Sequence, residues 1–249
     1  MLRETTVFGP IFSRRLGSSL GINLLPEKGK ICNFDCVYCE CGWNKDGRGD
    51  STLPSAADVQ AALEAKLQDC AAAGTPIDSI TFSGDGEPTL NPEFPEIIAL
   101  TLALRDRYYP SAKVSVLSNA TRAGVPAVFE ALKKVDNAIL KLDAPTTAQA
   151  RLVNRPAGDY RVEEVVEHLK RFEGQFVLQT MFLRGPGWAT EDWVEGWMDL
   201  VRQLNPREVM VYTINRETPM KGLQKYTEAE MRALVQPLLQ EGYSIQIKG

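Results

Sequence analysis

Short apolar runs alternate along the chain with longer stretches in which apolar residues recur every three or four positions. The short runs are rich in Val, Ile, Leu and Phe, which is typical of buried parallel strands. They span residues 20–25, 79–83, 113–118, 138–142, 176–183, 208–214 and 243–247. A strand followed by a helix, repeated along the chain, predicts a parallel sheet with right-handed crossovers and therefore an α/β fold.

The stretches between these runs carry helix-start signals. Ser55 with Asp58, and Thr227 with Glu230, have the spacing of a capping box. Thr190 is expected to cap a further helix. The periodicity fits an open doubly wound sheet and an incomplete β/α barrel equally well, and it does not decide between them.

Polar residues gather where the predicted strands end. In either fold the carboxyl ends of the strands meet at one edge of the sheet, where active sites are built. Lys141 and Asp143 alternate along an otherwise apolar strand, so they share a face, and buried charges need a partner. The candidate residues at these ends are Asp85, Gly86, Glu87, Ser118, Asn119, Lys141, Asp143, Gln179 and Met181.

Composition narrows the class of protein. The 249 residues are 44% hydrophobic and 24% charged, which is ordinary for a globular protein and excludes a disordered chain or a disulfide scaffold. No apolar run is long enough to span a membrane, and residues 1–5 show no secretory signal, so a cytoplasmic protein is expected. A net charge of −4 argues against a broadly basic nucleic-acid surface. The oligomeric state stays open.

Cysteine usage is the unusual feature. Four of the five cysteines, Cys32, Cys36, Cys39 and Cys41, lie within ten residues, and His168 is the single histidine. The C-x3-C-x2-C spacing lets three thiolates converge on one group, and thiolates suit Fe–S clusters or zinc. Cys41 could complete a zinc site, but such sites usually pair two separated knuckles. The spacing therefore favours a [4Fe–4S] cluster, whose fourth iron position is left for another ligand.

The segment Cys32-Asn-Phe-Asp-Cys36-Val-Tyr38-Cys39 resembles the cluster motif of the radical S-adenosylmethionine (SAM) superfamily. The resemblance implies that Cys32, Cys36 and Cys39 hold a [4Fe–4S] cluster and that SAM chelates the open iron. In that family the reduced cluster cleaves SAM to a 5′-deoxyadenosyl radical, which abstracts hydrogen from a substrate. It further implies a low-potential electron donor of the flavodoxin or ferredoxin type.

The same resemblance assigns residues to SAM. Asp85-Gly86-Glu87-Pro88 is similar to the family's Gly-Gly-Glu-Pro motif, which meets the SAM amino group, with Asp85 in place of the first Gly. Tyr38 is expected beside the adenine. The remaining residues that the resemblance places around the ribose and carboxylate of SAM are Ser118, Asn119, Lys141 and Asp143. Gln179 and Met181 share a face of the run 176–183 and are further candidates for contact with SAM, with a core position as the alternative for Met181. No catalytic residue is assigned.

The opening segment, from Phe8 to Leu25, resembles iron–sulfur oxidoreductases related to tRNA wyosine synthases, which favours an RNA or nucleoside substrate. Wyosine synthases carry a second cluster on upstream cysteines, whereas no cysteine precedes Cys32, so the wyosine reaction itself is not expected. The alternatives are a protein or peptide radical enzyme such as a glycyl-radical activase, an enzyme of a small metabolite, and a non-catalytic zinc or Fe–S module. Arg14 and Arg15 either hold a substrate phosphate or are solvated.

These observations together predict an α/β partial (β/α)6 TIM-type barrel, open on one side, as a single radical SAM domain over residues 1–249. Residues 1–19 are expected to form an N-terminal extension. Residues 41–54 are rich in Asn, Asp and Gly and are expected to be a mobile loop next to the cluster that orders over substrate. Cys70 lies on an apolar helical stripe and is expected in the core.

Overall fold

The computed structural model describes residues 5–13, 16–47 and 49–249. Arg14 and Arg15 lie outside the described residues. The chain divides into two compact units, which are described separately below. Unit 1 comprises Met1–Asn33, Asn44–Ser118 and Gly124–Ala138, and unit 2 comprises Phe34–Trp43, Asn119–Ala123 and Ile139–Gly249.

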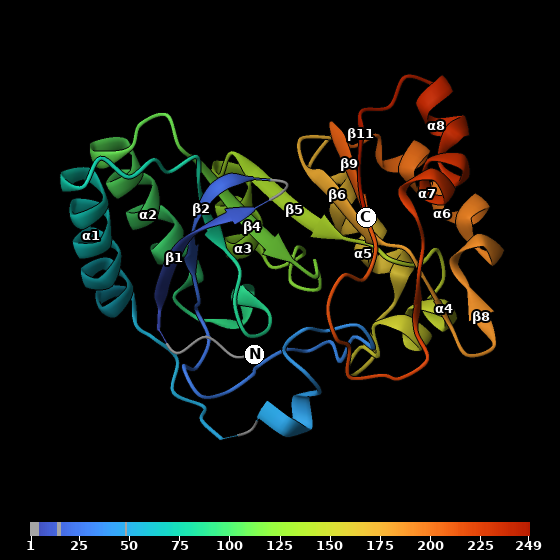
Figure 1. The fold of residues 1–249 in the computed structure, drawn as a ribbon, viewed down its shortest axis with the longest axis horizontal. Coiled ribbons are helices and arrows are strands. Elements are labelled where there is room, and N and C mark those ends of the chain that lie inside the picture. Colours follow the sequence, from blue (N-terminus) through green and yellow to red (C-terminus); the bar gives the residue numbers. More distant parts are fainter. Residues whose placement is uncertain (1–4, 14–15, 48) are drawn as a thin grey trace. The chain divides into compact units, whose positions relative to one another are not determined.

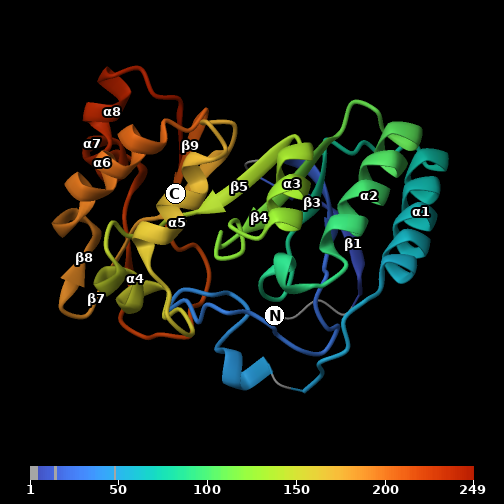
Figure 2. The same cartoon turned by 180° about the vertical axis from the view of Figure 1, so that it is seen from behind.

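Unit 1 is a four-stranded sheet with helices along one face (Figures 1 and 2). Strands β1 and β2 pair antiparallel, β2 runs parallel to β3, and β3 runs parallel to β4. The elements are β1 (Val7–Ser13), β2 (Gly17–Ile22), β3 (Ser79–Phe82), β4 (Lys113–Ser118), α1 (Ala56–Ala72), α2 (Phe94–Tyr108) and α3 (Pro126–Lys134), with short 3-10 turns at Asn44–Gly47 and Pro88–Leu90. Every residue of β3 is buried, as expected of a covered parallel strand.

The first strand differs from the sequence prediction. Strand β2 begins at Gly17 and ends at Ile22 rather than spanning residues 20–25, and the antiparallel strand β1 that precedes it was not predicted. The predicted strand extended to residue 25 because Leu24 and Leu25 are apolar. Both are buried, but they lie in the segment after β2. Strand β1 gave little signal because its side chains are at least partly exposed, Phe12 by 81%.

Unit 2 contains a parallel arrangement of four strands and a small second sheet. Strand β5 (Asn137–Lys141), of which residues 139–141 belong to this unit, pairs with β6 (Val177–Met181). Strand β6 pairs with β9 (Glu208–Tyr212), and β9 pairs with β11 (Ile245–Lys248). The second sheet has the order β10 (Gln224–Lys225), β7 (Leu183–Gly185), β8 (Trp188–Ala189). The helices are α4 (Thr147–Val153), α5 (Val162–Lys170), α6 (Val194–Leu204), α7 (Glu228–Leu234) and α8 (Gln236–Gln240), with a 3-10 turn at Thr190–Asp192.

The helix-start predictions are confirmed in two cases and wrong in one. Ser55 and Thr227 both form complete capping boxes, at the starts of α1 and α7. Thr190 does not cap α6, which begins at Val194 without a side-chain cap. Its hydroxyl instead donates to the Leu183 carbonyl at 2.8 Å and accepts from the Leu183 N–H at 3.1 Å. Both hydrogen bonds of the Thr190 hydroxyl are thus made to the first residue of strand β7.

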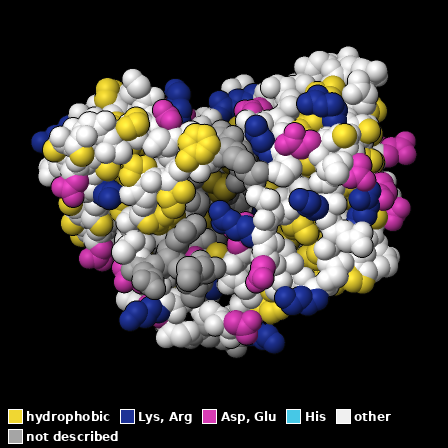
Figure 3. Space-filling model, viewed as in Figure 1, with side chains coloured by type: hydrophobic (Ala, Val, Ile, Leu, Met, Phe, Trp, Pro, Cys, Tyr) yellow, Lys and Arg dark blue, Asp and Glu magenta, His cyan; other side chains and the backbone are white. Residues whose placement is uncertain are grey.

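The remaining expectations concern the core and the surface. Cys70 is buried on α1, as predicted. Lys and Arg side chains alternate with Asp and Glu side chains on the face of the molecule seen in Figure 3, and the described atoms there form no single basic surface. Within the described part of the chain, every helix is too short or too polar to cross a membrane.

Candidate functional site

The candidate site residues fall into two sets, one in each unit. Those of unit 1 are Cys32, Asp85, Gly86, Glu87 and Ser118, and those of unit 2 are Cys36, Tyr38, Cys39, Asn119, Lys141, Asp143, Gln179 and Met181. Each set is described within its own unit.

Gly86 brings the segment entering the cysteine motif against the turn that follows β3. Ile31 forms a bridge with Gly86, donates its N–H to the Asp85 carbonyl at 3.1 Å, and accepts the Glu87 N–H at 3.0 Å. Gly86 has a φ of +141°, and a Cβ there would lie 1.8 Å from the Ile31 carbonyl oxygen. Only glycine therefore allows this close approach one residue before Cys32.

Glu87 is held in place in the segment after β3, directly before the 3-10 turn Pro88–Leu90. Its side chain is buried, and Oε1 accepts hydrogen bonds from the Ser118 hydroxyl at 2.8 Å, the Thr89 hydroxyl at 2.6 Å and the Thr89 N–H at 3.1 Å. Strand β4 supplies Ser118, so two residues singled out from the sequence are in direct contact. A buried carboxylate so placed is suited to bind a cationic group.

Asn23 and Asn44 support the candidate residues of unit 1, and neither was singled out from the sequence. Asn23 Oδ1 accepts the N–H of the buried Asp85 at 3.2 Å and that of Leu25 at 3.2 Å. Asn44 Nδ2 donates to the Cys32 carbonyl at 3.0 Å. Asn23 could have been noticed in the sequence because it is a polar residue within the apolar run 20–25.

Strand register places the candidate residues of unit 2 on one face of the sheet. Lys141 of β5 pairs with Gln179 of β6, and Met181 of β6 pairs with Tyr212 of β9. Side chains two positions apart on a strand share a face, so Gln179 and Met181 point the same way. Aligned residues of neighbouring parallel strands share that face, which therefore also carries Lys141 and Tyr212.

Lys141 and Asp143 lie at the centre of a buried hydrogen-bond network. Lys141 Nζ donates to the Tyr38 hydroxyl at 2.9 Å and to the Tyr212 hydroxyl at 3.0 Å, and it lies 3.7 Å from Asp143 Oδ2. Tyr38 donates its hydroxyl proton to Asp143, and the Met181 N–H donates to Asp143 Oδ1 at 2.8 Å. The charge of Lys141 at the end of β5 and that of Asp143, two residues beyond the strand, are thus partnered.

The network fixes two protonation states. Burial by itself would lower the pKa of Lys141, but Asp143, Tyr212 and Cys36 together outweigh burial and raise the pKa overall. Burial raises the pKa of Tyr38 well above its usual range, and Asp143 adds to this effect. Lys141 is therefore a cation, and Tyr38 is a neutral hydrogen-bond donor, throughout the physiological range.

The backbone around Cys36 is attached to the end of helix α4. The Asp35 N–H donates to the Asn154 carbonyl at 2.9 Å, and the Val37 N–H donates to the Val153 carbonyl at 3.0 Å. Asn154 Nδ2 lies 3.4 Å from Cys36 Sγ. Burial raises the pKa of the Cys36 thiol to about 11. The sulfur therefore carries a proton that a metal would displace.

The rest of the cysteine motif is more exposed. The Cys39 N–H donates to the Cys36 carbonyl at 3.1 Å, which forms a turn, and Glu40 pairs with Arg216. All five cysteines are free thiols. Among residues 5–13, 16–47 and 49–249, no three His, Cys, Asp or Glu side chains form a ready-made metal site. The role of Cys41 stays unassigned.

Gln179 and Asn119 differ in how their side chains are satisfied. Gln179 is 3% exposed, and its Nε2 has no hydrogen-bond partner within the described structure. A buried amide left unpaired costs about 1–3 kcal/mol, which indicates a position for a ligand. Asn119 Oδ1 instead accepts the Thr121 N–H at 3.1 Å and the Thr121 hydroxyl at 2.7 Å, so it stabilises its own turn.

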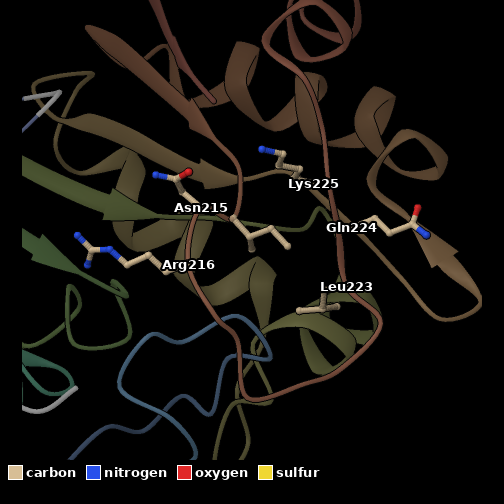
Figure 4. A pocket seen from close by; sticks show the side chains of 6 residues that line it. Asn215, Arg216, Leu223, Gln224 and Lys225 are labelled. Carbon is tan, nitrogen blue, oxygen red and sulfur yellow. The ribbon is translucent and has the colours of Figure 1, made fainter.

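A pocket of about 480 Å³ follows the carboxyl end of β9. In Figure 4 Asn215 and Arg216 lie on one side, and Leu223, Gln224 and Lys225 lie on the other. The Gln224 amide points away from Asn215. The pocket combines cationic, amide and apolar side chains, and its volume falls in the range of small-ligand sites.

Asn154 and Tyr212 are the functional candidates of unit 2 that sequence reasoning missed. Tyr212 ends a predicted strand, so its place at a carboxyl end was a usable signal. Asn154 follows a helix and precedes Arg155 and Pro156, which is an ordinary helix-end pattern. Its contact with Cys36 depends on residues 118 positions apart and has no local signature.

Comparison with known proteins gives the class directly. The family model described as the radical SAM superfamily matches residues 27–195, and the chain belongs to this superfamily. Within it, the chain is 32% identical over 229 residues to UPF0026 protein slr1464 of Synechocystis sp., covering 89% of this chain and 79% of that protein. It is 30% identical over 229 residues to a UPF0026 protein of Helicobacter pylori, covering 90% and 71%.

Solved structures confirm the fold class. A radical SAM methyltransferase from Sphaerobacter thermophilus matches with a TM-score of 0.69 at 16% identity, over 92% of this chain and 65% of that chain. TYW1 with a lysine–pyruvate adduct matches with a TM-score of 0.65 at 16% identity, over 92% and 76%. Streptococcus suis SuiB bound to SAM matches with a TM-score of 0.66 at 15% identity, over 89% of this chain and 49% of SuiB. This chain thus spans about half of SuiB, and the predicted α/β partial barrel is confirmed.

Superfamily membership supports an enzyme and implies a [4Fe–4S] cluster and SAM as cofactors. The residues fit both groups. The cysteine motif supplies soft thiol donors, and Cys36 has an amide donor beside its sulfur. The unpartnered Gln179 amide and the buried Glu87 carboxylate are polar groups of the kind that would bind SAM.

Proposed function

We propose that this protein is a radical SAM enzyme in which Cys32, Cys36 and Cys39 hold the cluster. The observation that carries the proposal lies in unit 2, where one side chain links the cysteine motif to the buried charges. Asn154 Nδ2 is 3.4 Å from Cys36 Sγ and 2.6 Å from Asp143 Oδ2, and Asp143 accepts the Tyr38 proton. A charged network beside a buried cysteine is expected at a cofactor site.

The remaining residues would bind and orient SAM. Glu87 would hold the cationic amino group, and Lys141 would balance the negative charge of Asp143 and of a ligand carboxylate. The unpartnered amide of Gln179 would donate to SAM, with Tyr38 and Met181 beside it. When bound, the cluster supplies one electron that splits SAM into methionine and a 5′-deoxyadenosyl radical, which takes hydrogen from the substrate. That electron requires a low-potential donor of the flavodoxin or ferredoxin type.

Anaerobic reconstitution tests the enzyme proposal. The reduced protein with SAM is expected to form 5′-deoxyadenosine, measured by chromatography and mass spectrometry. Cys36→Ala should abolish the product, while Cys70→Ala should retain it, because Cys70 is buried on α1 and outside the motif. No product from the wild type, or equal product from Cys36→Ala, would contradict the proposal and favour a non-catalytic zinc or Fe–S module.

We further propose an RNA or nucleoside substrate, supported by the resemblance of residues 8–25 to proteins related to wyosine synthases. The pocket beside Arg216 and Lys225 suits a single nucleotide of an RNA in volume, and the two cations suit its phosphate. Because the net charge is −4 and the face seen in Figure 3 carries mixed charges, we expect few cations to contact phosphate. The affinity should therefore fall with salt by a shallow slope.

Filter binding of unmodified tRNA tests this substrate class. Binding is expected at low salt and should weaken in Lys225→Glu, whereas the matched exchange Lys133→Glu in unit 1 should have little effect. No binding at low salt would overturn the RNA substrate and leave a protein, peptide or small metabolite as the reactant.

A further inference from the structure

We propose that Asn154 is a positioning residue for the cluster, whose side-chain amide donates an N–H···S hydrogen bond to Cys36 and raises the cluster's reduction potential. The inference rests on the proposed function to the extent that Cys36 is a cluster ligand. It starts from the 3.4 Å separation of Asn154 Nδ2 and Cys36 Sγ, both in unit 2.

The hydrogens of this network can be assigned one by one. Asn154 Nδ2 carries two hydrogens, and one is directed to Asp143 Oδ2 at 2.6 Å. The Tyr38 hydroxyl oxygen lies 3.4 Å from Nδ2, but it already accepts from Lys141 at 2.9 Å. Tyr38 gives its own proton to Asp143. At 3.4 Å the Tyr38 oxygen lies beyond the usual N–H···O range of about 2.7–3.2 Å, whereas the same distance suits the larger sulfur atom, so the second Asn154 hydrogen is directed to Cys36.

The backbone around Asn154 fixes the direction of this amide. Asn154 is the C-cap residue that directly follows helix α4, and its N–H donates to the Ala150 carbonyl at 2.7 Å. The carbonyls of Asn154 and Val153 accept the N–H groups on either side of Cys36, at 2.9 and 3.0 Å. The same short segment therefore holds both the backbone and the sulfur of the cysteine. A side-chain exchange at Asn154 leaves the backbone hydrogen bonds in place.

The direction of the effect follows from charge. An N–H dipole aimed at sulfur stabilises negative charge on it, and the reduced cluster is one charge more negative than the oxidised cluster. The N–H therefore stabilises the reduced state more and raises the potential. Hydrogen bonds around metal ligands commonly tune the metal in this way. The Asp143 carboxylate accepts one hydrogen of the Asn154 amide and thereby orients the other toward Cys36. Asp143 therefore acts on the cluster's reduction through Asn154.

The test is the midpoint potential of the reconstituted protein, followed by EPR during redox titration. Asn154→Asp removes the donor at nearly constant shape, and Asn154→Ala removes it without adding charge. Both are expected to shift the midpoint to more negative values, Asn154→Asp by more because its carboxylate also faces Cys36. The control is Asn91→Asp, since Asn91 is equally buried but donates to the Leu24 and Pro54 carbonyls. Its midpoint should equal that of the wild type.

An unchanged midpoint in Asn154→Ala with full iron content would overturn the inference, while wild-type formation of 5′-deoxyadenosine would leave the proposed function standing. If the variants do not retain a cluster, pulsed EPR on the reduced wild type with ¹⁵N-labelled asparagine side chains tests whether the hydrogen bond to the cluster exists. A ¹⁵N coupling to the cluster supports the hydrogen bond, and its absence contradicts it. Failure of the wild type to form 5′-deoxyadenosine would instead count against the proposed function.

Discussion

The Ser118 hydroxyl donates a 2.8 Å hydrogen bond to Oε1 of Glu87 and so joins the carboxyl end of β4 to the segment that follows β3 in unit 1. Both side chains are buried, and Thr89 adds two further hydrogen bonds to the same oxygen. The carboxylate is thereby fixed before any ligand arrives. Preorganisation of this kind lowers the entropic cost of binding, and it makes Glu87 the residue of unit 1 to test first.

Glu87→Gln should weaken SAM binding by roughly 10- to 100-fold, because a charge-assisted hydrogen bond contributes about 1.5–3 kcal/mol. Isothermal titration of the reconstituted protein measures the affinity. The matched control is Glu93→Gln, whose carboxylate accepts the Ala56 N–H at the start of α1 at 2.7 Å. Equal affinities for the two variants would contradict the assignment of Glu87 to SAM.

Lys141→Met should destabilise the apoprotein by about 3–5 kcal/mol, because it leaves the buried Asp143 charge without its cation. Urea denaturation followed by circular dichroism measures the loss. The double variant Lys141→Met/Asp143→Asn should recover part of this stability, with a coupling energy of about 1 kcal/mol or more. Strictly additive losses would show that the 3.7 Å pair is not energetically coupled.

Gln179→Leu should act on stability and on binding in opposite directions. It removes a buried amide whose Nε2 is unpartnered, so the apoprotein should be unchanged or about 1 kcal/mol more stable. SAM affinity should fall about tenfold, equivalent to ~1.4 kcal/mol. Thermal unfolding and calorimetric titration report the two effects.

Thr180→Val is the control for this variant. The Thr180 hydroxyl donates to the Leu142 carbonyl and accepts from Trp197 Nε1. Its loss should destabilise the apoprotein by about 1–3 kcal/mol without changing SAM affinity. A destabilised Gln179→Leu with normal SAM affinity would show that Gln179 is structural.

Asp136 should make the stability of unit 1 depend on pH. Burial opposes its charge, but the Val114 N–H at 2.9 Å and the Arg105 guanidinium at 2.8 Å outweigh burial and lower its pKa below the ordinary value of 3.8. A carboxyl whose pKa is lower when folded stabilises the protein above pH 3.8, and this stability is lost as the pH falls through the folded pKa. Asp136→Asn should therefore cost about 1–2 kcal/mol at pH 7 and progressively less below about pH 4.

Urea unfolding at several pH values measures this difference. Asp106→Asn is the matched control, because Asp106 contacts the same Arg105 but is 67% exposed. An exposed ion pair contributes about 0–1 kcal/mol, so this variant should be nearly neutral. A pH-independent loss in Asp136→Asn would contradict the explanation.

The parallel strands and the cysteine motif could be predicted because their signals are local. Strands β3, β4 and β9 are buried on consecutive positions, and buried strands give continuous apolar runs. Both capping boxes depend on side chains three residues apart. The grouping of Glu87 with Ser118 needed only the rule that parallel strands end at the same edge, whereas their direct hydrogen bond was not predicted.

The misses concern features that depend on distant residues. Strand β1 lies at the edge of its sheet, next to β2, and its side chains are at least partly exposed. Its sequence therefore shows only a weak alternation of apolar and polar residues. Thr190 has the composition of a cap, but strand β7 competes for its hydroxyl. The contact of Asn154 with Cys36 depends on how α4 ends beside the cysteine motif, and no spacing along the chain encodes it.

The central claim is that three cysteines hold a cluster whose remaining iron takes SAM. Electron–nuclear double resonance on the reduced, reconstituted protein with SAM labelled by ¹⁷O in its carboxylate tests it most directly. A ¹⁷O coupling of directly bound oxygen is predicted in the wild type and in Cys70→Ala, together with loss of the signal in Cys36→Ala. A cluster signal that SAM leaves unchanged, with no ¹⁷O coupling, would contradict the claim.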